Sequence, residues 1–327
     1  SDNDFKYVTD YANDLKLQLH GSDITFVVNR NINYTNICSF KCNFCAFSKG
    51  RGHDDLRGKP YNISHEEIIR RTNEAIERGA TEVCLQGGIH PQYSGETYLD
   101  IVRAIRSASS SIHIHAFSPL EIDHGRKTLN ISVKEFLVEL KKAGLNSLPG
   151  TAAEILHDEI RAIICPDKLT SKQWINIIET SHSVGLPTTS TMMFGHVERN
   201  SHVAHHLLKL LNLQQKTNGI TEFVPLPFVA DEAPIFRRGQ ARPGPTFKET
   251  ILVHSVARIL FQGQINNIQG SWVKMGLAGL KFLLTSGIND IGGVLMNESI
   301  TRSAGASFGQ ELQLEEVEGI VNELGLN

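Results

Sequence analysis

Residues 64–86, SHEEIIRRTNEAIERGATEVCLQ, join two patterns that decide the fold. The stretch begins with Ser-His-Glu-Glu, a capping-box pattern, and predicts a helix over Ser64–Arg78. A short apolar run then predicts a strand over Thr81–Gln86. A helix that passes directly into a strand is the repeating element of βα architecture, so the fold depends on whether this element recurs.

The element recurs along most of the chain, because short β-branched runs alternate with longer segments of helical period past residue 30. The predicted strands are Asn31–Ile37, Thr81–Gln86, Ser111–Ala116, Asn146–Leu148, Thr188–Phe194, Thr221–Leu226, Gln264–Ile268 and Ile288–Ile291. Further helices are predicted over Ser132–Ala143, Ser171–Val184, Ser201–Thr217, Phe247–Phe261 and Leu312–Leu324. Eight parallel strands with right-handed crossovers predict an α/β fold, a (β/α)8 TIM-type barrel; an open doubly wound sheet is the alternative. We expect a barrel domain over residues 31–327 and an N-terminal helical extension over residues 1–30.

Composition predicts an ordinary globular protein without a polyanion-binding or membrane-spanning surface. The 327 residues carry a net charge of -3, with 40% apolar and 20% charged residues. No apolar run approaches the roughly 20 residues of a membrane span, and residues 1–16 lack the apolar core of a signal peptide. Three of the five cysteines lie within eight residues, which favours a metal site in a reducing compartment over disulfides. We therefore expect a cytoplasmic protein with neither nucleic-acid nor membrane partners.

The stretch NYTNICSFKCNFCAFSKG, residues 33–50, contains these three cysteines directly after the first predicted strand. Cys38, Cys42 and Cys45 should therefore lie at the C-terminal mouth of the barrel, where barrel enzymes carry their chemistry. Thiolates suit zinc or iron–sulfur clusters. A structural zinc needs four protein ligands, which only His53 could complete here. A four-iron cubane on three thiolates instead leaves one iron open to a ligand.

The spacing CxxxCxxC, with Phe44 before the third cysteine, resembles the signature of the radical S-adenosylmethionine (SAM) superfamily. The resemblance implies a [4Fe–4S] cluster on Cys38, Cys42 and Cys45, whose open iron chelates SAM. It also implies a low-potential electron donor, because reduction of SAM releases methionine and a 5′-deoxyadenosyl radical. A cluster-bearing electron carrier or sensor is the alternative from another class, but carriers usually hold the cluster with four cysteines.

Several further segments resemble one branch of this superfamily, which contains FO synthase and two futalosine-pathway menaquinone enzymes. They include INYTNIC, LQGGIHP, HAFSPLEI, GLNSLPGTAAEIL, TTSTMMFGH and NDIGG, and the resemblance extends over residues 32–309. HAFSPLE and GLNSLPGTAAEIL most resemble the CofH-type half of FO synthase, so the menaquinone enzymes are the alternative. The single cysteine triad matches the single-subunit form.

The resemblance implies that the 4-hydroxybenzyl group of L-tyrosine is joined to C5 of 5-amino-6-(D-ribitylamino)uracil. In the family's chemistry, the deoxyadenosyl radical abstracts a hydrogen atom from tyrosine and the Cα–Cβ bond then breaks. The amino-acid remnant leaves as an iminoacetate that hydrolyses to glyoxylate. A separate CofG-type radical SAM partner would then close the deazaflavin ring.

The cofactor-binding candidates follow the predicted second, third and fourth strands. Gly87 and Gly88 match a glycine pair of the superfamily whose bare backbone approaches SAM, although Ile89 replaces the usual acidic residue. Glu121 is expected to end the third strand and to bind the SAM ribose or the substrate amine. Glu154, after the fourth strand, is expected to bind a ribose or cap the next helix.

The substrate-binding candidates lie on the later strands. Alternation in TTSTMMFGH puts Thr189, Thr191 and Met193 on one face of a strand, and hydroxyls on this face would suit a ribityl chain or a uracil edge. His196 follows this strand as a candidate for hydrogen bonding or proton transfer, with a structural histidine as the alternative. Asp290 is expected to end the eighth strand and to anchor the substrate ammonium or ribityl hydroxyls, with helix capping as the alternative. The sequence identifies no catalytic residue.

Overall fold

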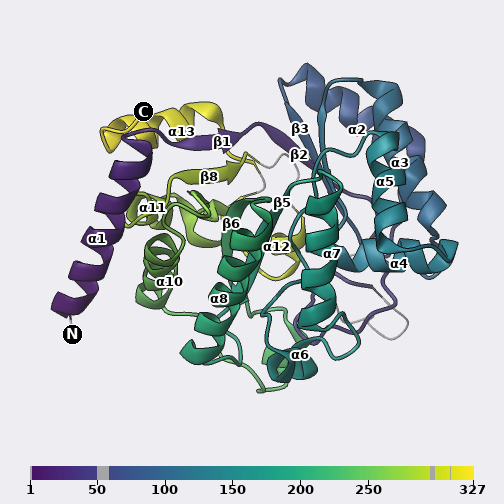
Figure 1. Cartoon of the computed structure of the whole chain (residues 1–327). Helices are drawn as coiled ribbons and strands as arrows, with labels where there is room; N and C mark the ends of the chain where they lie inside the picture. Colours follow the sequence, from purple (N-terminus) through teal and green to yellow (C-terminus); the bar gives the residue numbers. More distant parts are fainter. Residues whose placement is uncertain (1, 50–58, 295–298, 310) are drawn as a thin grey trace.

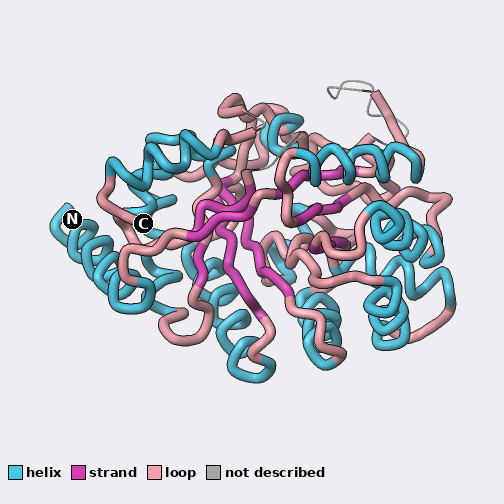
Figure 2. Tube along the Cα trace, turned by 90° about the horizontal axis from the view of Figure 1, so that it is seen from above, coloured by secondary structure: helices cyan, strands magenta, loops and turns pink. Residues whose placement is uncertain are grey.

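The structure is a computed structural model, and it describes residues 2–49, 59–294, 299–309 and 311–327. Its strands are β1 (Thr25–Val27), β2 (Asn29–Asn33), β3 (Glu82–Gln86), β4 (His113–Ala116), β5 (Thr188–Phe194), β6 (Ile220–Pro227), β7 (Asn267–Ile268) and β8 (Asp290–Gly293). In the view from above, the strands lie at the centre and helices surround them (Figure 2). The chain therefore has the layered α/β organisation that the sequence predicts.

The helices mostly follow the strands in alternation (Figure 1). They are α1 (Asp2–His20), α2 (His65–Glu77), α3 (Gly95–Ala108), α4 (Pro119–Leu129), α5 (Val133–Ala143), α6 (Asp158–Ile164), α7 (Ser171–Ser183), α8 (Asn200–Thr217), α9 (Pro234–Arg237), α10 (Phe247–Leu260), α11 (Trp272–Leu284), α12 (Ile300–Ser303) and α13 (Leu314–Glu323). The capping box predicted at Ser64 is partly present, since its hydroxyl accepts a hydrogen bond from the Glu67 backbone N–H at 3.3 Å. The other helices predicted from sequence begin and end within a few residues of their observed bounds.

All assigned strand pairs are parallel. They form the sheets β2-β3-β4, β5-β6-β7 and β1-β8. Isolated parallel β-bridges also pair His115 with Ser147, Leu148 with Thr188, and Gln269 with Asp290. The strand predicted over Asn146–Leu148 is thus present only as two bridged residues, because the chain turns away at Pro149. The fold is an α/β arrangement of parallel strands with helices outside.

The stretch predicted as a helical extension, residues 1–30, contains α1 but also a strand that the sequence did not predict. β1 pairs with β8, and one residue later the chain continues as β2, which pairs with β3. Helix α1 packs against α10 (Figure 1), and the buried Lys16 ammonium donates to the Leu284 carbonyl at 3.0 Å. The N-terminal stretch therefore supplies both an outer helix and part of the central sheet.

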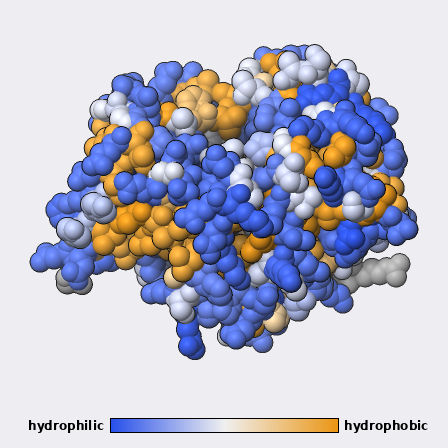
Figure 3. Space-filling model, in the orientation of Figure 1, coloured by the Kyte–Doolittle hydropathy of each residue, from blue (hydrophilic) through white to orange (hydrophobic). Residues whose placement is uncertain are grey.

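The apolar core consists of two clusters, one beneath each three-stranded sheet. The first packs β5–β8 against α6–α8, α10, α11 and α13 and includes Trp174, Phe223 and Trp272. The second packs β2–β4 against α2–α5 and includes Tyr34 and Phe136. Within the described ranges, no helix is long and apolar enough to cross a membrane. Some apolar side chains stay exposed in the region of α1 and α10 (Figure 3). Phe247 of α10 and Phe282 of α11 are both exposed, and their rings meet edge to face.

Candidate active site

Two cavities lie along the inner faces of the strands. The upper cavity, of about 370 Å³, lies at the carboxyl ends of the strands, where Cys38 and Glu121 contribute to its wall. The lower cavity, of about 430 Å³, lies at the amino ends and is lined by Glu82, His113 and Asp290, the first residues of β3, β4 and β8. Both cavities are lined by Gln86, Thr151, Leu226 and Gln269. The two cavities therefore share a wall.

The three predicted cluster ligands lie on the loop after β2 and all line the upper cavity. Two distant parts of the chain hold this loop. The backbone N–H and the hydroxyl of Ser39 donate to the Ile89 carbonyl at 2.8 and 3.0 Å, and the backbone N–H of Asn43 donates to the Ile164 carbonyl at 2.8 Å. His53, the residue that a zinc site would need, lies outside the described residues.

The thiols of the loop have the surroundings that suit an iron–sulfur cluster. The Cys38 sulfur accepts a hydrogen bond from the Ile89 backbone N–H at 3.3 Å, and the Cys45 sulfur accepts one from Ser48 N–H at 3.4 Å. Such donors tune the sulfurs of a bound cluster. Burial raises the pKa of the Cys38 and Cys42 thiols, so these ligands depend on a bound metal to become thiolates. All five cysteines are free.

Two buried lysines, Lys168 and Lys49, lie near the same thiols. The Lys168 ammonium lies 5.2 Å from the centre of the Phe44 ring. Burial opposes its charge, but Cys42 and Glu154 raise the pKa of Lys168 well above its usual range. Lys49 is 5% exposed, and its ammonium has no hydrogen-bond partner within the described part of the chain. Buried cations beside three thiols fit a cluster that carries net negative charge.

The glycine pair after β3 packs tightly against the cysteine loop. A Cβ on Gly87 would overlap the Tyr34 ring, and a Cβ on Gly88 would overlap the Ile37 carbonyl oxygen. Gly88 N–H also donates to the Thr35 carbonyl at 2.9 Å. Both glycines line the upper cavity, and only a residue without a side chain allows the two loops to approach this closely.

Glu121 lines the upper cavity, but it does not end a strand as predicted. It is the third residue of α4, because Ser118 caps that helix after β4 has ended at Ala116. Its carboxylate is 2% exposed and accepts hydrogen bonds from Ser118 N–H at 2.7 Å, from Gly87 N–H at 3.3 Å, and from the hydroxyls of Ser118 and Tyr34. Burial raises the pKa of Glu121, and these donors oppose the rise. Glu121 therefore joins β2, β3 and α4 at the wall of the upper cavity.

Glu154 also lies at the upper cavity, on the loop after residue 148. Its side chain forms a buried ion pair with Lys168 at 2.7 Å, and the two side chains are 12% and 11% exposed. The backbone of Glu154 is left-handed, with φ of 46°, a conformation that costs free energy in a residue with a side chain. Buried Arg161 stabilises this loop, because its guanidinium donates to the carbonyls of Ala152 and Ala153.

The alternation predicted for β5 matches the positions of its side chains along the cavities. Thr189 and Thr191 line the lower cavity and Met193 lines the upper one, while Met192 and Phe194 pack into the core on the other side. The Thr191 hydroxyl donates to the Gly150 carbonyl at 2.9 Å. One face of this strand therefore borders both cavities.

Asp290 and His196 lie away from the cysteines. Asp290 begins β8 rather than ending it, because the run Ile288–Ile291 spans the preceding turn, and the residue therefore lines the lower cavity. Its carboxylate accepts hydrogen bonds from the Thr25 hydroxyl and from Gly292 N–H at 2.5 Å. His196 is fully buried and lines neither cavity; its Nε2–H donates to the Met193 carbonyl at 3.1 Å.

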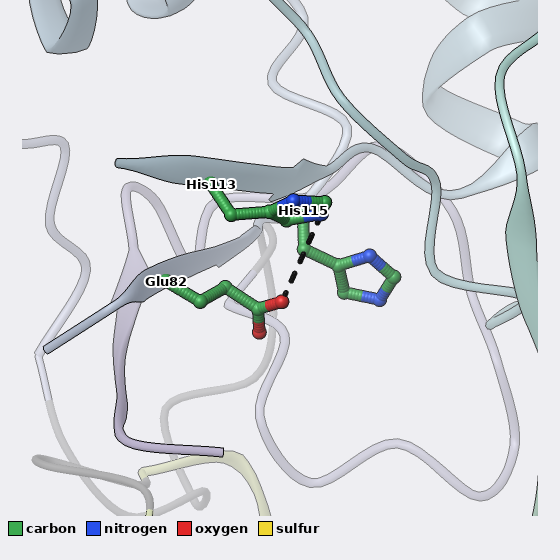
Figure 4. Close-up of side chains that lie close together, drawn as sticks. All are labelled: Glu82, His113 and His115. Atoms are coloured by element: carbon green, nitrogen blue, oxygen red, sulfur yellow. Dashed lines mark ion pairs between the residues drawn. The ribbon is translucent and has the colours of Figure 1, made fainter. Parts of the chain in front are cut away.

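Glu82, His113 and His115 come together in the wall of the lower cavity (Figure 4). Each offers a ligand atom, and these atoms lie within 4.8 Å of one another, a spacing that could hold a metal ion. Ser147 lies between the two imidazoles, with its oxygen 2.7 Å from His113 Nε2 and 2.7 Å from His115 Nδ1. A second group with this spacing is partly exposed and consists of the α6 cap residue His157, Glu159 of α6 and His202 of α8.

Two family models match the chain: the radical SAM superfamily over residues 32–210, and the CofH/MqnC C-terminal region over residues 217–327. The chain belongs to the radical SAM superfamily. Within the radical SAM proteins it belongs with the CofH-type transferases. It is 48% identical to the 5-amino-6-(D-ribitylamino)uracil--L-tyrosine 4-hydroxyphenyl transferase of Methanothermobacter thermautotrophicus, over 93% of this chain and 82% of the relative. It is 47% identical to FO synthase of Mycobacterium leprae, but spans only 36% of that longer protein. Radical SAM membership implies SAM and a [4Fe–4S] cluster as cofactors.

Two solved structures have the same fold at low sequence identity. Methylornithine synthase superposes with a TM-score of 0.76 at 15% identity, covering 100% of this chain and 90% of that one. The FeFe-hydrogenase maturase HydG from Carboxydothermus hydrogenoformans superposes with a TM-score of 0.72 at 15% identity, covering 98% and 71%. These structures agree with an α/β radical SAM fold over the whole chain.

Sequence reasoning missed three residues that hold or line the wall of the upper cavity. They are Tyr34, which bonds Glu121; Arg161, which holds the Glu154 loop; and Lys168, which pairs with Glu154. Tyr34 lies within the recognised segment INYTNIC, so its position next to the cysteines was a signal. Arg161 and Lys168 lie in stretches without a motif, and only the fold reveals them.

Proposed function

We propose that this protein joins the 4-hydroxybenzyl group of L-tyrosine to C5 of 5-amino-6-(D-ribitylamino)uracil, a step in the synthesis of deazaflavin FO, the precursor of coenzyme F420. The observation that carries the proposal is identity of 46–48% with transferases of this name, over 93–97% of the chain. Each of these matches also covers more than four-fifths of the relative. The matched stretch therefore spans nearly the whole chain and is not confined to the cysteine loop.

A futalosine-pathway menaquinone enzyme is the second candidate, because the name of the C-terminal family model covers both groups. The nearly full-length identity to the named transferases favours the first candidate. An electron carrier or sensor fits less well, since a cavity of about 370 Å³ with two lysines adjoins the cysteines.

The closed barrel is part of the proposal. The three small sheets and the single bridges at residues 147, 148 and 269 would connect the strands into one ring of eight, with β1 and β2 together forming the first strand. We also keep the division into an N-terminal extension over residues 1–30 and a barrel domain over residues 31–327, with β1 of the extension closing the ring through β8.

The upper cavity is assigned to the cofactors. Cys38, Cys42 and Cys45 would hold the [4Fe–4S] cluster, which together with SAM supplies the deoxyadenosyl radical. Gly87 and Gly88 keep the wall beside the cysteines bare, and Glu121 fixes their position through its bond to Gly87 N–H. The Glu154 and Lys168 ion pair adds a rigid polar group to the same wall. These residues bind and orient; none of them is assigned a proton transfer.

The substrates are assigned to the region where the two cavities meet. Thr189, Thr191 and Asp290 would contact a substrate from the lower cavity. His196 would act only indirectly, because its ring contacts the Met193 carbonyl and Met193 lines the upper cavity.

A low-potential reductant would deliver the electron. A separate CofG-type enzyme would close the ring, since the FO synthases that match are nearly three times as long.

Product analysis tests the proposal. The reconstituted enzyme is mixed anaerobically with reductant, SAM, the aminouracil and ring-labelled L-tyrosine, and the products are examined by mass spectrometry. We expect the labelled ring in a uracil adduct, together with methionine, 5′-deoxyadenosine and glyoxylate. If the label stays in tyrosine while a futalosine-type substrate is turned over in a parallel mixture, the menaquinone assignment replaces this one.

A further inference from the structure

The lower cavity is polar where the interior of a parallel barrel is normally packed with branched apolar side chains. Positions that alternate along the strands bring Glu82, His113, Thr189, Glu222 and Asp290 into its wall. Its volume of about 430 Å³ falls within the ~300–1,000 Å³ of small-molecule sites. A hollow lined by polar groups favours a hydrophilic ligand over a packing role.

The charge of the lower cavity selects against anions. Three carboxyl groups line it, those of Glu82, Glu222 and Asp290, and the described residues of its wall include no lysine or arginine. Burial raises the pKa of all three, and Asp290 raises that of Glu222 further. Carboxyl groups of this kind exchange hydrogen bonds with hydroxyl and amino groups, whereas a ligand carboxylate would find no lysine or arginine among the described residues of this wall.

One of these carboxyls has an open acceptor. Oε1 of Glu222 is buried and has no hydrogen-bond partner within the described residues. Asp290 is different, because its two oxygens already accept from the Thr25 hydroxyl and from Gly292 N–H. A buried acceptor without a donor costs free energy, so Glu222 is the group that a ligand donor would satisfy.

The upper cavity differs from the lower one because its wall includes lysines. Lys168 and Lys274 lie in this wall with the three cysteines and with two carboxyl groups, those of Glu121 and Glu154. Glu154 forms an ion pair with Lys168. An amino-acid carboxylate needs a cation, and the two ammonium groups here supply the only lysine charge found in either described wall. Gln86 and Gln269 belong to both walls, so a ligand in one cavity can face a ligand in the other.

We infer that the two substrates occupy different cavities: the uncharged, polyhydroxylated pyrimidine lies in the lower cavity with Glu222 as its principal acceptor, and the amino acid lies in the upper cavity beside SAM. This inference rests on the proposed function, because it takes the aminouracil and tyrosine as the two substrates. The reacting carbon of the pyrimidine then faces upward at the shared wall. Lys274, on α11, is the candidate cation for the tyrosine carboxylate.

One substitution in each cavity tests whether the two substrates occupy different cavities. Binding of 5-amino-6-(D-ribitylamino)uracil to the anaerobic holoenzyme is measured by calorimetry, and KM for tyrosine is obtained from SAM cleavage. Glu222→Gln should weaken binding of the aminouracil about tenfold or more and leave the tyrosine KM within about twofold. Lys274→Met should raise the tyrosine KM about tenfold and leave aminouracil binding unchanged. Glu139→Gln, the same chemical change on the exposed face of α5, should alter neither value.

A second lower-cavity variant guards against a local rearrangement at residue 222. Val224→Phe places a ring in the same cavity and should abolish aminouracil binding, while circular dichroism and cluster content report an intact fold. If the wild type binds and converts the aminouracil and both lower-cavity variants bind it equally well, the division is overturned and the proposed function stands. If the wild type neither binds nor converts the aminouracil, the proposed function and the division both fail.

Discussion

The upper cavity has three thiols, two ammonium groups and two carboxyl groups in its wall, whereas the lower cavity has three carboxyl groups and no lysine or arginine among its described residues. Both are lined by the same strands, and Thr191 and Met193 differ only by one alternation along β5. The two cavities therefore differ in charge because they lie at different positions along the same strands. One set of parallel strands can thus present two chemically distinct sites when successive positions on the same face differ in charge.

The largest effect should come from the thiols that set the upper cavity apart. Replacing Cys38, Cys42 or Cys45 by alanine should remove the cluster and bring SAM cleavage down to background, because two thiolates cannot hold a cubane that needs three. Iron and sulfide analysis after anaerobic reconstitution measures this. Cys165→Ala, a buried cysteine of the core, should keep full cluster content. A cluster that survived loss of a loop cysteine would contradict the assignment.

How far the sequence predicts each cavity depends on whether the deciding contacts are local. The cysteine loop and the glycine pair are short motifs, so their place at the carboxyl ends of the strands was predictable. The inward face of β5 followed from its period of two. Lys168 is 14 residues from Glu154, and their pairing depends on how α6 and the loops on both sides of it fold.

The errors occurred where a strand was short or shifted. β1 has three residues within a mostly polar stretch, too few for an alternation pattern. Asp290 was expected at the upper end because the apolar run Ile288–Ile291 was taken as the strand, whereas pairing begins at Asp290 itself. A shift of this size moves a side chain from one cavity to the other.

The second-largest effect should come from the buried ion pair of the upper cavity. Lys168→Met leaves the Glu154 carboxylate buried without its partner, so the free energy of unfolding should fall by about 3–5 kcal/mol. Urea denaturation measures the loss. Lys216→Met breaks a pair whose lysine is 66% exposed and should cost less than about 1 kcal/mol. Equal losses would mean that the upper cavity does not shield its charges.

A third effect concerns stability at acidic pH, where a histidine of the lower cavity would take up a proton on unfolding. Burial lowers the pKa of His115 from 6.5 to about 4, so between these values the unfolded chain binds a proton that the folded chain does not. Stability should therefore fall as pH drops through this range, with about 3 kcal/mol due to His115. His115→Gln should flatten the fall when unfolding is measured across the range.

Other histidines titrate in the same pH range, so the prediction concerns the difference in stability between the wild type and the variant. Burial also lowers the pKa of His182 and His254 to about 4, so both contribute to the fall in the wild type and in the variant. Glu82 and His113 face the same part of the cavity and remain in both proteins. Lys168, whose pKa lies well above its usual range, stays charged throughout. Parallel stability curves for wild type and His115→Gln would show that His115 is not protected from protonation.

The smallest effect concerns the packing between the glycine pair and the cysteine loop. In Gly88→Ala the new Cβ would overlap the Ile37 carbonyl oxygen and lie 3.0 Å from the Cys38 Cβ, so the loop must move. We expect a loss of about 1–3 kcal/mol in the free energy of unfolding and a lower cluster content, since the first ligand shifts. Gly319→Ala, in α13 with open space around it, should instead stabilise by about 0.5–1 kcal/mol through helix propensity. If Gly88→Ala kept wild-type stability and cluster content but bound SAM more weakly, the glycine would be required for approach of the ligand, and the upper wall would be less rigid than its close contacts indicate.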